Sequence, residues 1–143
     1  MKLIMAALCD RATIREGLLH ILGAGVTQCT VAIPGAADLD LAILIRAENW
    51  EELAGRHTLQ TTLRHQDGTQ VGAVEMGWEA PTTNPAEQDQ PLPQLPVVAP
   101  LRNILLTHEG EYHASIAVDG TELGSVHFNV TKMHLPGVTV QLR

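Results

Sequence analysis

The feature that most constrains this chain is an alternation of apolar and polar residues with a period of two. Between Leu39 and Ile45, leucine or isoleucine occupies every second position. Further along, apolar or aromatic residues again occupy every second position: Tyr112, Ala114, Ile116 and Val118. Successive side chains of a β-strand point to opposite faces, so each such segment buries one face. The pattern therefore predicts a fold built from strands.

Two turns and one short helix punctuate this pattern. Asp67-Gly68 and Asp119-Gly120 lie between apolar segments, which predicts two hairpins with either primed turns or type I turns followed by a bulge. In ENWEELAG, Asn49 and Glu52 form a plausible capping box and Gly55 can end a single helical turn. The expected strands are Lys2–Cys9, Leu18–Val31, Leu39–Ala47, His57–His65, Gln70–Trp78, Val98–Thr107, Glu111–Val118 and Leu123–Val130.

Eight strands without βαβ alternation predict an all-β fold, in which two antiparallel sheets form an immunoglobulin-like sandwich as a single domain of residues 1–143. We expect the strand Lys2–Cys9 to pair antiparallel with Leu18–Val31. Gly23 and Gly25 lack the third glycine and the following helix of a dinucleotide-binding turn. They are interpreted as a bulge or a close backbone approach within one long, bent strand.

Composition narrows the possible partners and the compartment. Sixteen Asp and Glu stand against nine Lys and Arg, for a formal net charge of -7, which disfavours nucleic acid. No apolar run is long enough to cross a membrane. The opening MKLIMAALCD lacks a small residue before Cys9, so a first strand is preferred to an export signal. Cys9 and Cys29 are expected to stay reduced in a cytoplasmic protein.

Residues 81–100 hold six of the eight prolines and no Lys or Arg. This composition predicts an extended connector on the surface between the two sheets. Within it, Pro93 and Pro96 have the Pro-x-x-P spacing that aromatic-lined grooves recognise. A plain connector and a peptide ligand both remain open for this segment.

Candidates for chemistry are weak. His113 and His127 are expected to meet on the outward face of the second hairpin, as weak candidates for metal ligands, but two ligands do not make a zinc site. The two serines lack a nucleophile elbow, and the acidic pair Asp38 and Asp40 is interpreted as solvated. We therefore expect no cofactor, no metal and no enzymatic activity.

Candidates for partner binding are clearer. Trp50 lies in the polar crossover, where it either caps one end of the sandwich or anchors a partner. Residues 131–143 form a C-terminal extension, in which Val138, Val140 and Leu142 alternate after Pro136-Gly137. Such a segment either folds back onto its own sheet or pairs with the edge of another subunit.

Three segments, ALCDRATIREGLLHILGAGVTQ, ENWEELAGRHTLQTTLRHQDG and GEYHASIAVDGTELGSVHFNV, resemble a family of uncharacterised bacterial domains of unknown function. The resemblance covers most of residues 3–130 and implies an immunoglobulin-like sandwich without known catalytic residues. The favoured function is a non-catalytic protein-binding or structural module that binds a protein partner or its own copies. The alternative is a sandwich that binds a small ligand or a metal, or a hydrolytic enzyme.

Overall fold

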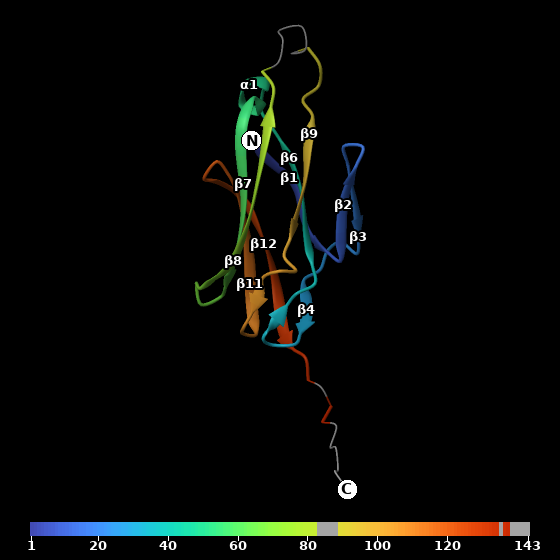
Figure 1. Cartoon of the computed structure of the whole chain (residues 1–143), viewed down its shortest axis with the longest axis vertical. Helices are drawn as coiled ribbons and strands as arrows, with labels where there is room; N and C mark the ends of the chain where they lie inside the picture. The colour runs from blue at the N-terminus through green and yellow to red at the C-terminus, as the bar shows by residue number, and fades with distance from the viewer. Residues whose placement is uncertain (83–88, 135, 138–143) are drawn as a thin grey trace.

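The computed structural model describes residues 1–82, 89–134 and 136–137 of the chain. They form an all-β structure with a single short helix, α1 (Trp50–Leu53) (Figure 1). No helix among these residues has both the length and the apolar character of a membrane span. The strands are β1 (Lys2–Cys9), β2 (Arg11–Arg15), β3 (Leu18–Leu22), β4 (Gln28–Val31), β5 (Gly35–Ala36), β6 (Asp40–Arg46), β7 (Gly55–His65), β8 (Gln70–Ala80), β9 (Gln94–Pro100), β10 (Leu105–Leu106), β11 (Gly110–Val118) and β12 (Thr121–Lys132).

The strands form two larger and two smaller sheets. The three-stranded sheet has the order β1-β6-β9, and the five-stranded sheet has the order β4-β12-β11-β7-β8. β4 pairs with β12 in parallel, whereas the neighbours within the rest of both sheets are antiparallel. The smaller sheets are the β2–β3 hairpin and the short β5–β10 pair.

One hydrophobic core contains residues of both larger sheets. Leu41, Ile43 and Ile45 of β6 and Tyr112 and Ile116 of β11 are all fully buried in it. In β11 the buried residues alternate with half-exposed ones, as a strand covered on one face requires. β6 is buried on nearly every residue, and the β2–β3 hairpin lies beside β6 and β9 (Figure 1).

Several local predictions are confirmed. Helix α1 follows Asn49, whose Oδ1 accepts a hydrogen bond from the Glu52 amide at 2.8 Å. The second hairpin closes with a two-residue primed turn, because Val118 pairs with Thr121 and both Asp119 and Gly120 have positive φ. The strands predicted at residues 2–9, 39–47, 57–65, 70–78, 111–118 and 123–130 are found, with shifts of three residues or fewer at their ends.

The prediction of one long strand from Leu18 to Val31 is wrong. β3 ends at Leu22 and β4 begins at Gln28; Gly23 and Gly25, between them, have φ of 68° and 90°. A Cβ on Gly23 would lie 2.6 Å from the Asp10 carboxylate. The close neighbour is thus a side chain rather than the predicted backbone, and Gly23 lies between two strands rather than at a bulge within one. β3 pairs with β2, so β1 is free to pair with β6 instead.

The end of the Pro-rich segment is a strand and not the predicted connector. Its second half, Gln94–Pro100, is strand β9 and pairs antiparallel with β6 along its whole length. The strand predicted at 98–107 therefore begins four residues too late and is interrupted after Pro100, before β10. Prolines fit in β9 because it is an edge strand, where a missing amide donor need not break a ladder.

Candidate binding groove

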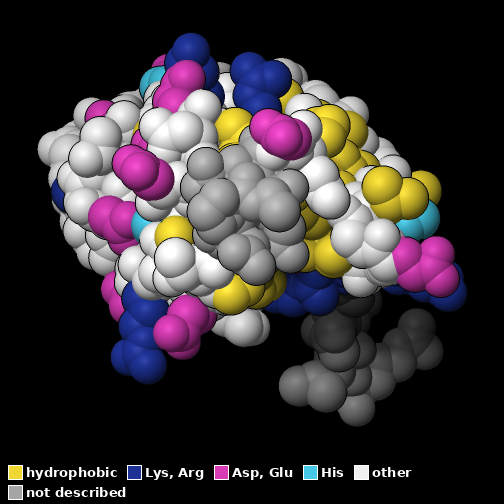
Figure 2. Space-filling model, turned by 90° about the horizontal axis from the view of Figure 1, so that it is seen from above, with side chains coloured by type: hydrophobic (Ala, Val, Ile, Leu, Met, Phe, Trp, Pro, Cys, Tyr) yellow, Lys and Arg dark blue, Asp and Glu magenta, His cyan; other side chains and the backbone are white. Residues whose placement is uncertain are grey.

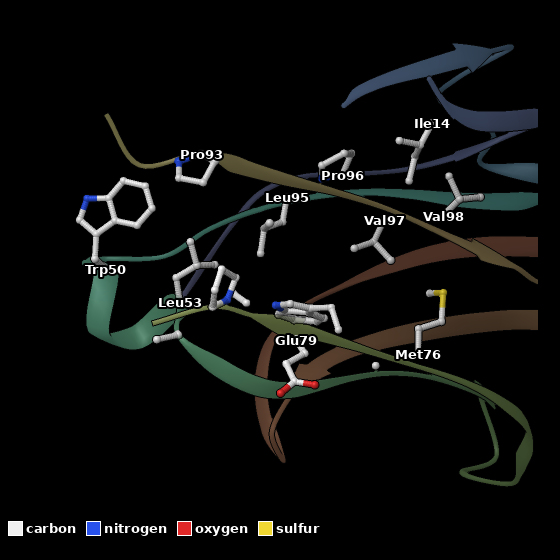
Figure 3. Close-up of a pocket in the computed structure, with 15 residues that line it drawn as sticks. Ile14, Trp50, Leu53, Met76, Glu79, Pro93, Leu95, Pro96, Val97 and Val98 are labelled. Atoms are coloured by element: carbon white, nitrogen blue, oxygen red, sulfur yellow. The ribbon is translucent and has the colours of Figure 1, made fainter. Parts of the chain in front are cut away.

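An apolar cavity of about 650 Å³ lies between β8 and β9, the edge strands of the two larger sheets. We call it the β8–β9 groove. Figure 3 shows Trp50 and Leu53 at one end, Ile14 and Val98 toward the other, and Leu95 and Val97 on the side of β9 that faces β8. Its lining comprises Ile14, Trp50, Leu53, Ala54, Met76, Gly77, Trp78, Glu79, Ala80, Pro81, Pro93, Leu95, Pro96, Val97 and Val98.

Strand β8 supplies one wall through its period of two. Met76, Trp78 and Ala80 are half-buried, whereas Glu75 and Glu79 between them are exposed. The apolar side chains of β8 therefore face the core and the groove, and the acidic side chains face outward. The opposite wall comes from β9, in which Leu95 to Val98 are all half-buried.

Helix α1 closes one end of the groove and is held there by His57. The His57 Nε2 atom lies 3.1 Å from the Leu53 carbonyl oxygen and 3.0 Å from that of Ala54. Its Nδ1 atom lies 2.7 Å from the Asp119 carboxylate. Every partner is an acceptor, so both nitrogens donate only when the ring is an imidazolium. The hydrogen bond to Asp119 accordingly raises the pKa of His57.

The two strand edges that border the groove differ in their capacity to pair. Among the described residues, β8 and β9 are each the last strand of their sheet. β9 contains Pro96 and Pro100, which have no amide donor. β8 contains no proline between Gln70 and Ala80. β8 is thus the edge that offers an uninterrupted set of backbone donors and acceptors.

The indole of Trp78 contributes an unused donor to this wall. Its Nε1 atom is buried and has no hydrogen-bond partner among the described residues. The ring itself packs against His57, with centroids 5.3 Å apart. A buried donor without a partner costs about 1–3 kcal/mol, so an acceptor brought into the groove would find this N–H available.

Acidic side chains flank the groove. Glu48 and Glu51 border the hollow beside Trp50, and Glu75 and Glu79 occupy the outward face of β8. Glu79 pairs with Arg56 at 3.4 Å, with both side chains exposed, whereas no ion pair of Glu75 occurs within the described residues. Figure 2 shows acidic side chains beside the hydrophobic ones that reach the surface at this end of the molecule.

The structure brings together three of the residues predicted to bind a partner. Trp50, Pro93 and Pro96 all line the β8–β9 groove, although the sequence pattern did not connect them. Val138, Val140 and Leu142 lie outside the described residues. Sequence reasoning missed Met76 and Leu95 as groove residues. The period-two pattern had predicted core positions in β8, but not that the end of this sheet lies open beside β9.

The two histidines singled out as metal ligands are neighbours, as expected from the hairpin. His113 pairs directly with His127 across β11 and β12, with ring centroids 5.6 Å apart. The His127 Nδ1 atom lies 3.0 Å from the Glu111 carboxylate, and both side chains are exposed. Among the described residues, no group of three or more His, Cys, Asp or Glu is arranged to hold a metal ion.

The interpretation of Asp38 and Asp40 as a solvated pair is wrong for Asp40. Asp38 is exposed and pairs with Arg11 at 2.9 Å, but Asp40 is only 1% exposed. Its carboxylate accepts a hydrogen bond from the Ala12 amide at 3.0 Å and forms an ion pair with Arg102. Asp40 is buried because β6 is the central strand of its sheet, and the ion pair compensates the charge.

Comparison with known proteins gives a family but no function. A family model described as "Family of unknown function (DUF6941)" matches residues 4–131. No curated protein matches the chain. Among solved structures, a Pseudomonas fluorescens alkylpurine DNA glycosylase, AlkC, bound to DNA containing an abasic site analog, is similar with a TM-score of 0.39 and 12% identity. The match covers 71% of this chain but only 27% of that protein, and so weak a likeness supports no conclusion about fold or function.

Proposed function

The chain belongs to the family of unknown function DUF6941, and we propose that it is a non-catalytic binding module with an immunoglobulin-like β-sandwich fold. The strand order supports the fold. The order β12-β11-β7-β8 faces β1-β6-β9 across one core, and β4 runs parallel to β12 at the edge of its sheet. Tyr112 donates a hydrogen bond to the His108 carbonyl at 2.7 Å, as in the tyrosine corner of such sandwiches.

The module binds an extended apolar segment of a protein in the β8–β9 groove. The observation that carries this proposal is an apolar groove placed directly beside an unpaired strand edge. An added strand would pair its backbone with β8 and insert alternate side chains between Met76, Trp78 and Leu95. One of its carbonyl groups could accept the unused hydrogen bond of Trp78 Nε1.

A second candidate is a small apolar ligand, since 650 Å³ lies within the range of small-molecule pockets. Such a ligand would fill the space between Trp50 and Trp78 but would leave the β8 edge unpaired. The peptide accounts for both features of the groove, and for that reason we favour it.

Selection from a display library of random nine-residue peptides tests the proposal. We expect selected peptides to carry apolar residues at alternate positions and to lose binding when Leu95→Glu places a charge in the groove. Thr62→Glu, a change on β7 at a residue that does not line the groove and whose partner in β8, Ala73, does not line it either, should leave binding intact. The absence of any enriched pattern, or equal binding by the Leu95→Glu variant when its circular dichroism shows it to be folded, would contradict the proposal.

The small-ligand alternative predicts a different result. Dodecanoate, used as the probe, would then quench the tryptophan fluorescence of the wild-type protein but not that of Leu95→Glu, and no peptide would be enriched. Alternating peptides that bind, without an effect of dodecanoate, assign the groove to an extended chain.

A further inference from the structure

We propose that the segment that binds in the β8–β9 groove is residues 138–143 of a second copy of this chain, so that two copies exchange their C-terminal segments. This inference rests on the proposed function, because it names the occupant of the groove. Three observations on different parts of the chain carry it: the alternation of the segment, the charge of β8, and the distance between the groove and Lys132.

The first observation is a match of side-chain periods. Val138, Val140 and Leu142 alternate with Thr139, Gln141 and Arg143, and in β8 Met76, Trp78 and Ala80 alternate with Glu75, Gly77 and Glu79. In an antiparallel register with Val140 opposite Trp78, all three apolar residues of the segment lie on the groove side. A shift by one residue would expose all of them, so the pattern selects the register.

The second observation is charge complementarity. The same register places Arg143 opposite Glu75 on the outward face of β8. Glu75 has no ion pair within the described residues, whereas Glu79 already pairs with Arg56 and would lie opposite the neutral Thr139. Opposite charges that face each other across two strands stabilise the pairing. Arg143, the single cation of residues 138–143, therefore meets Glu75, the β8 carboxylate without an ion pair among the described residues.

The third observation excludes the segment of the same chain as the occupant, so residues 138–143 can only fill the groove of another copy. Asp119 contacts His57, the partner of Trp78 in the sheet, so β12 begins at the level of Trp78. β12 ends at Lys132, eleven residues after its first residue Thr121 and at the opposite end from α1 (Figure 1), about 36 Å away at ~3.3 Å per residue. Val140 is eight residues beyond Lys132 and reaches at most about 28 Å. It cannot reach Trp78 of its own chain.

The exchange is reciprocal, because each copy has one groove and one segment. A closed pair with two-fold symmetry leaves neither groove empty. We therefore expect a dimer with twice the 15.4 kDa mass of the chain, and no growth into longer assemblies as the concentration rises.

Light scattering on the full chain tests the exchange with a matched pair of variants. Val140→Asp puts a charge on the groove side and should raise the dimer dissociation constant by at least about tenfold. Gln141→Asp adds the same charge on the outward side, opposite the uncharged Gly77, and should leave the mass near that of the wild-type dimer. A wild-type protein that stays monomeric at all concentrations, or a Val140→Asp variant that stays dimeric, would overturn the inference.

A disulfide trap tests the register itself. Val138→Cys and Ala80→Cys in one chain place the two thiols opposite each other across the new strand pair, and oxidation should then give a covalent dimer on a non-reducing gel. In the variant with Thr139→Cys and Ala80→Cys, the thiol at position 139 points to the opposite face of the strand pair, and no covalent dimer should form. Equal cross-linking of both variants would refute the register.

The failure of the inference can be told apart from the failure of the proposed function. If the wild-type chain is monomeric but the peptide library still yields alternating binders, the groove binds another protein and only the exchange is wrong. If neither occurs, both proposals fail. If the exchange is correct, Val140→Asp should bind the selected peptides more tightly than wild type, because its own copies no longer compete for the groove.

Discussion

At the scale of single residues, two charged groups secure the ends of the core. His57 joins the carbonyl groups of Leu53 and Ala54 to the Asp119 carboxylate. Asp40, buried at the start of β6, joins the β2 backbone to Arg102. Neither role was predictable from the sequence, because both depend on residues that are distant along the chain and meet only in the folded structure.

His57 makes the stability dependent on pH. Its pKa is raised in the folded protein by Asp119 and the α1 carbonyl groups, so the imidazolium stabilises the fold below the unfolded value of about 6.5. This contribution is lost as pH rises through the folded pKa. Thermal unfolding of wild type and His57→Gln followed between pH 5 and 9 should therefore show the largest difference in Tm at the acidic end. A difference that stays constant over this range would contradict the role of the charged ring.

Arg102 compensates a buried charge, so its removal should be costly. Arg102→Met leaves the Asp40 carboxylate, 1% exposed, without its cation, and we expect a loss of about 3 kcal/mol in the free energy of unfolding. Arg11→Met removes a pair with Asp38 in which both side chains are exposed and should cost at most about 1 kcal/mol. Urea unfolding of the two variants measures both values. Equal losses would mean that burial of Asp40 does not set the cost.

At the scale of elements, what the sequence predicts follows from local signals. β6, β7, β8, β11 and β12 were recognised from period-two patterns, β1 from its continuous apolar run, and α1 from Asn49 and Glu52. β2 was missed because its segment, RATIR, is mostly polar and, within the part of the chain that the structure describes, pairs with β3 alone. β9 was missed in part because prolines normally interrupt strands, yet an edge strand tolerates them. The groove depends on which edges face each other, and no local pattern encodes that arrangement.

The cap of α1 is an element-scale test. Asn49→Ala removes the side chain that accepts the Glu52 amide hydrogen bond and should lower the free energy of unfolding by about 1 kcal/mol. Asn49→Asp keeps an acceptor and should restore most of it. Because α1 carries Trp50 into the groove, tryptophan fluorescence should shift in the alanine variant only. An unchanged stability in Asn49→Ala would mean that the cap does not hold α1.

At the scale of the whole molecule, an apolar groove lies open between the edges of two sheets, and residues 138–143 of a second copy are its proposed occupant. The β8 edge, the apolar wall of β9 and the donor of Trp78 together form a surface that no local sequence pattern reveals, because it belongs to two sheets at once. The family match supplies no activity against which this surface could be judged. The test therefore has to come from the β8 backbone itself.

Amide hydrogen exchange along β8 in the full-length wild-type chain is the most direct measurement, with Val140→Asp as the unpaired reference. Some backbone N–H groups of β8 between Val74 and Ala80 point away from β7, toward the free edge. If an extended segment pairs with β8, these amides exchange slowly in wild type and faster in the variant, while the amides of β11 are unchanged. Equal and rapid exchange of these edge-facing β8 amides in both proteins would contradict the claim that an extended segment pairs with β8.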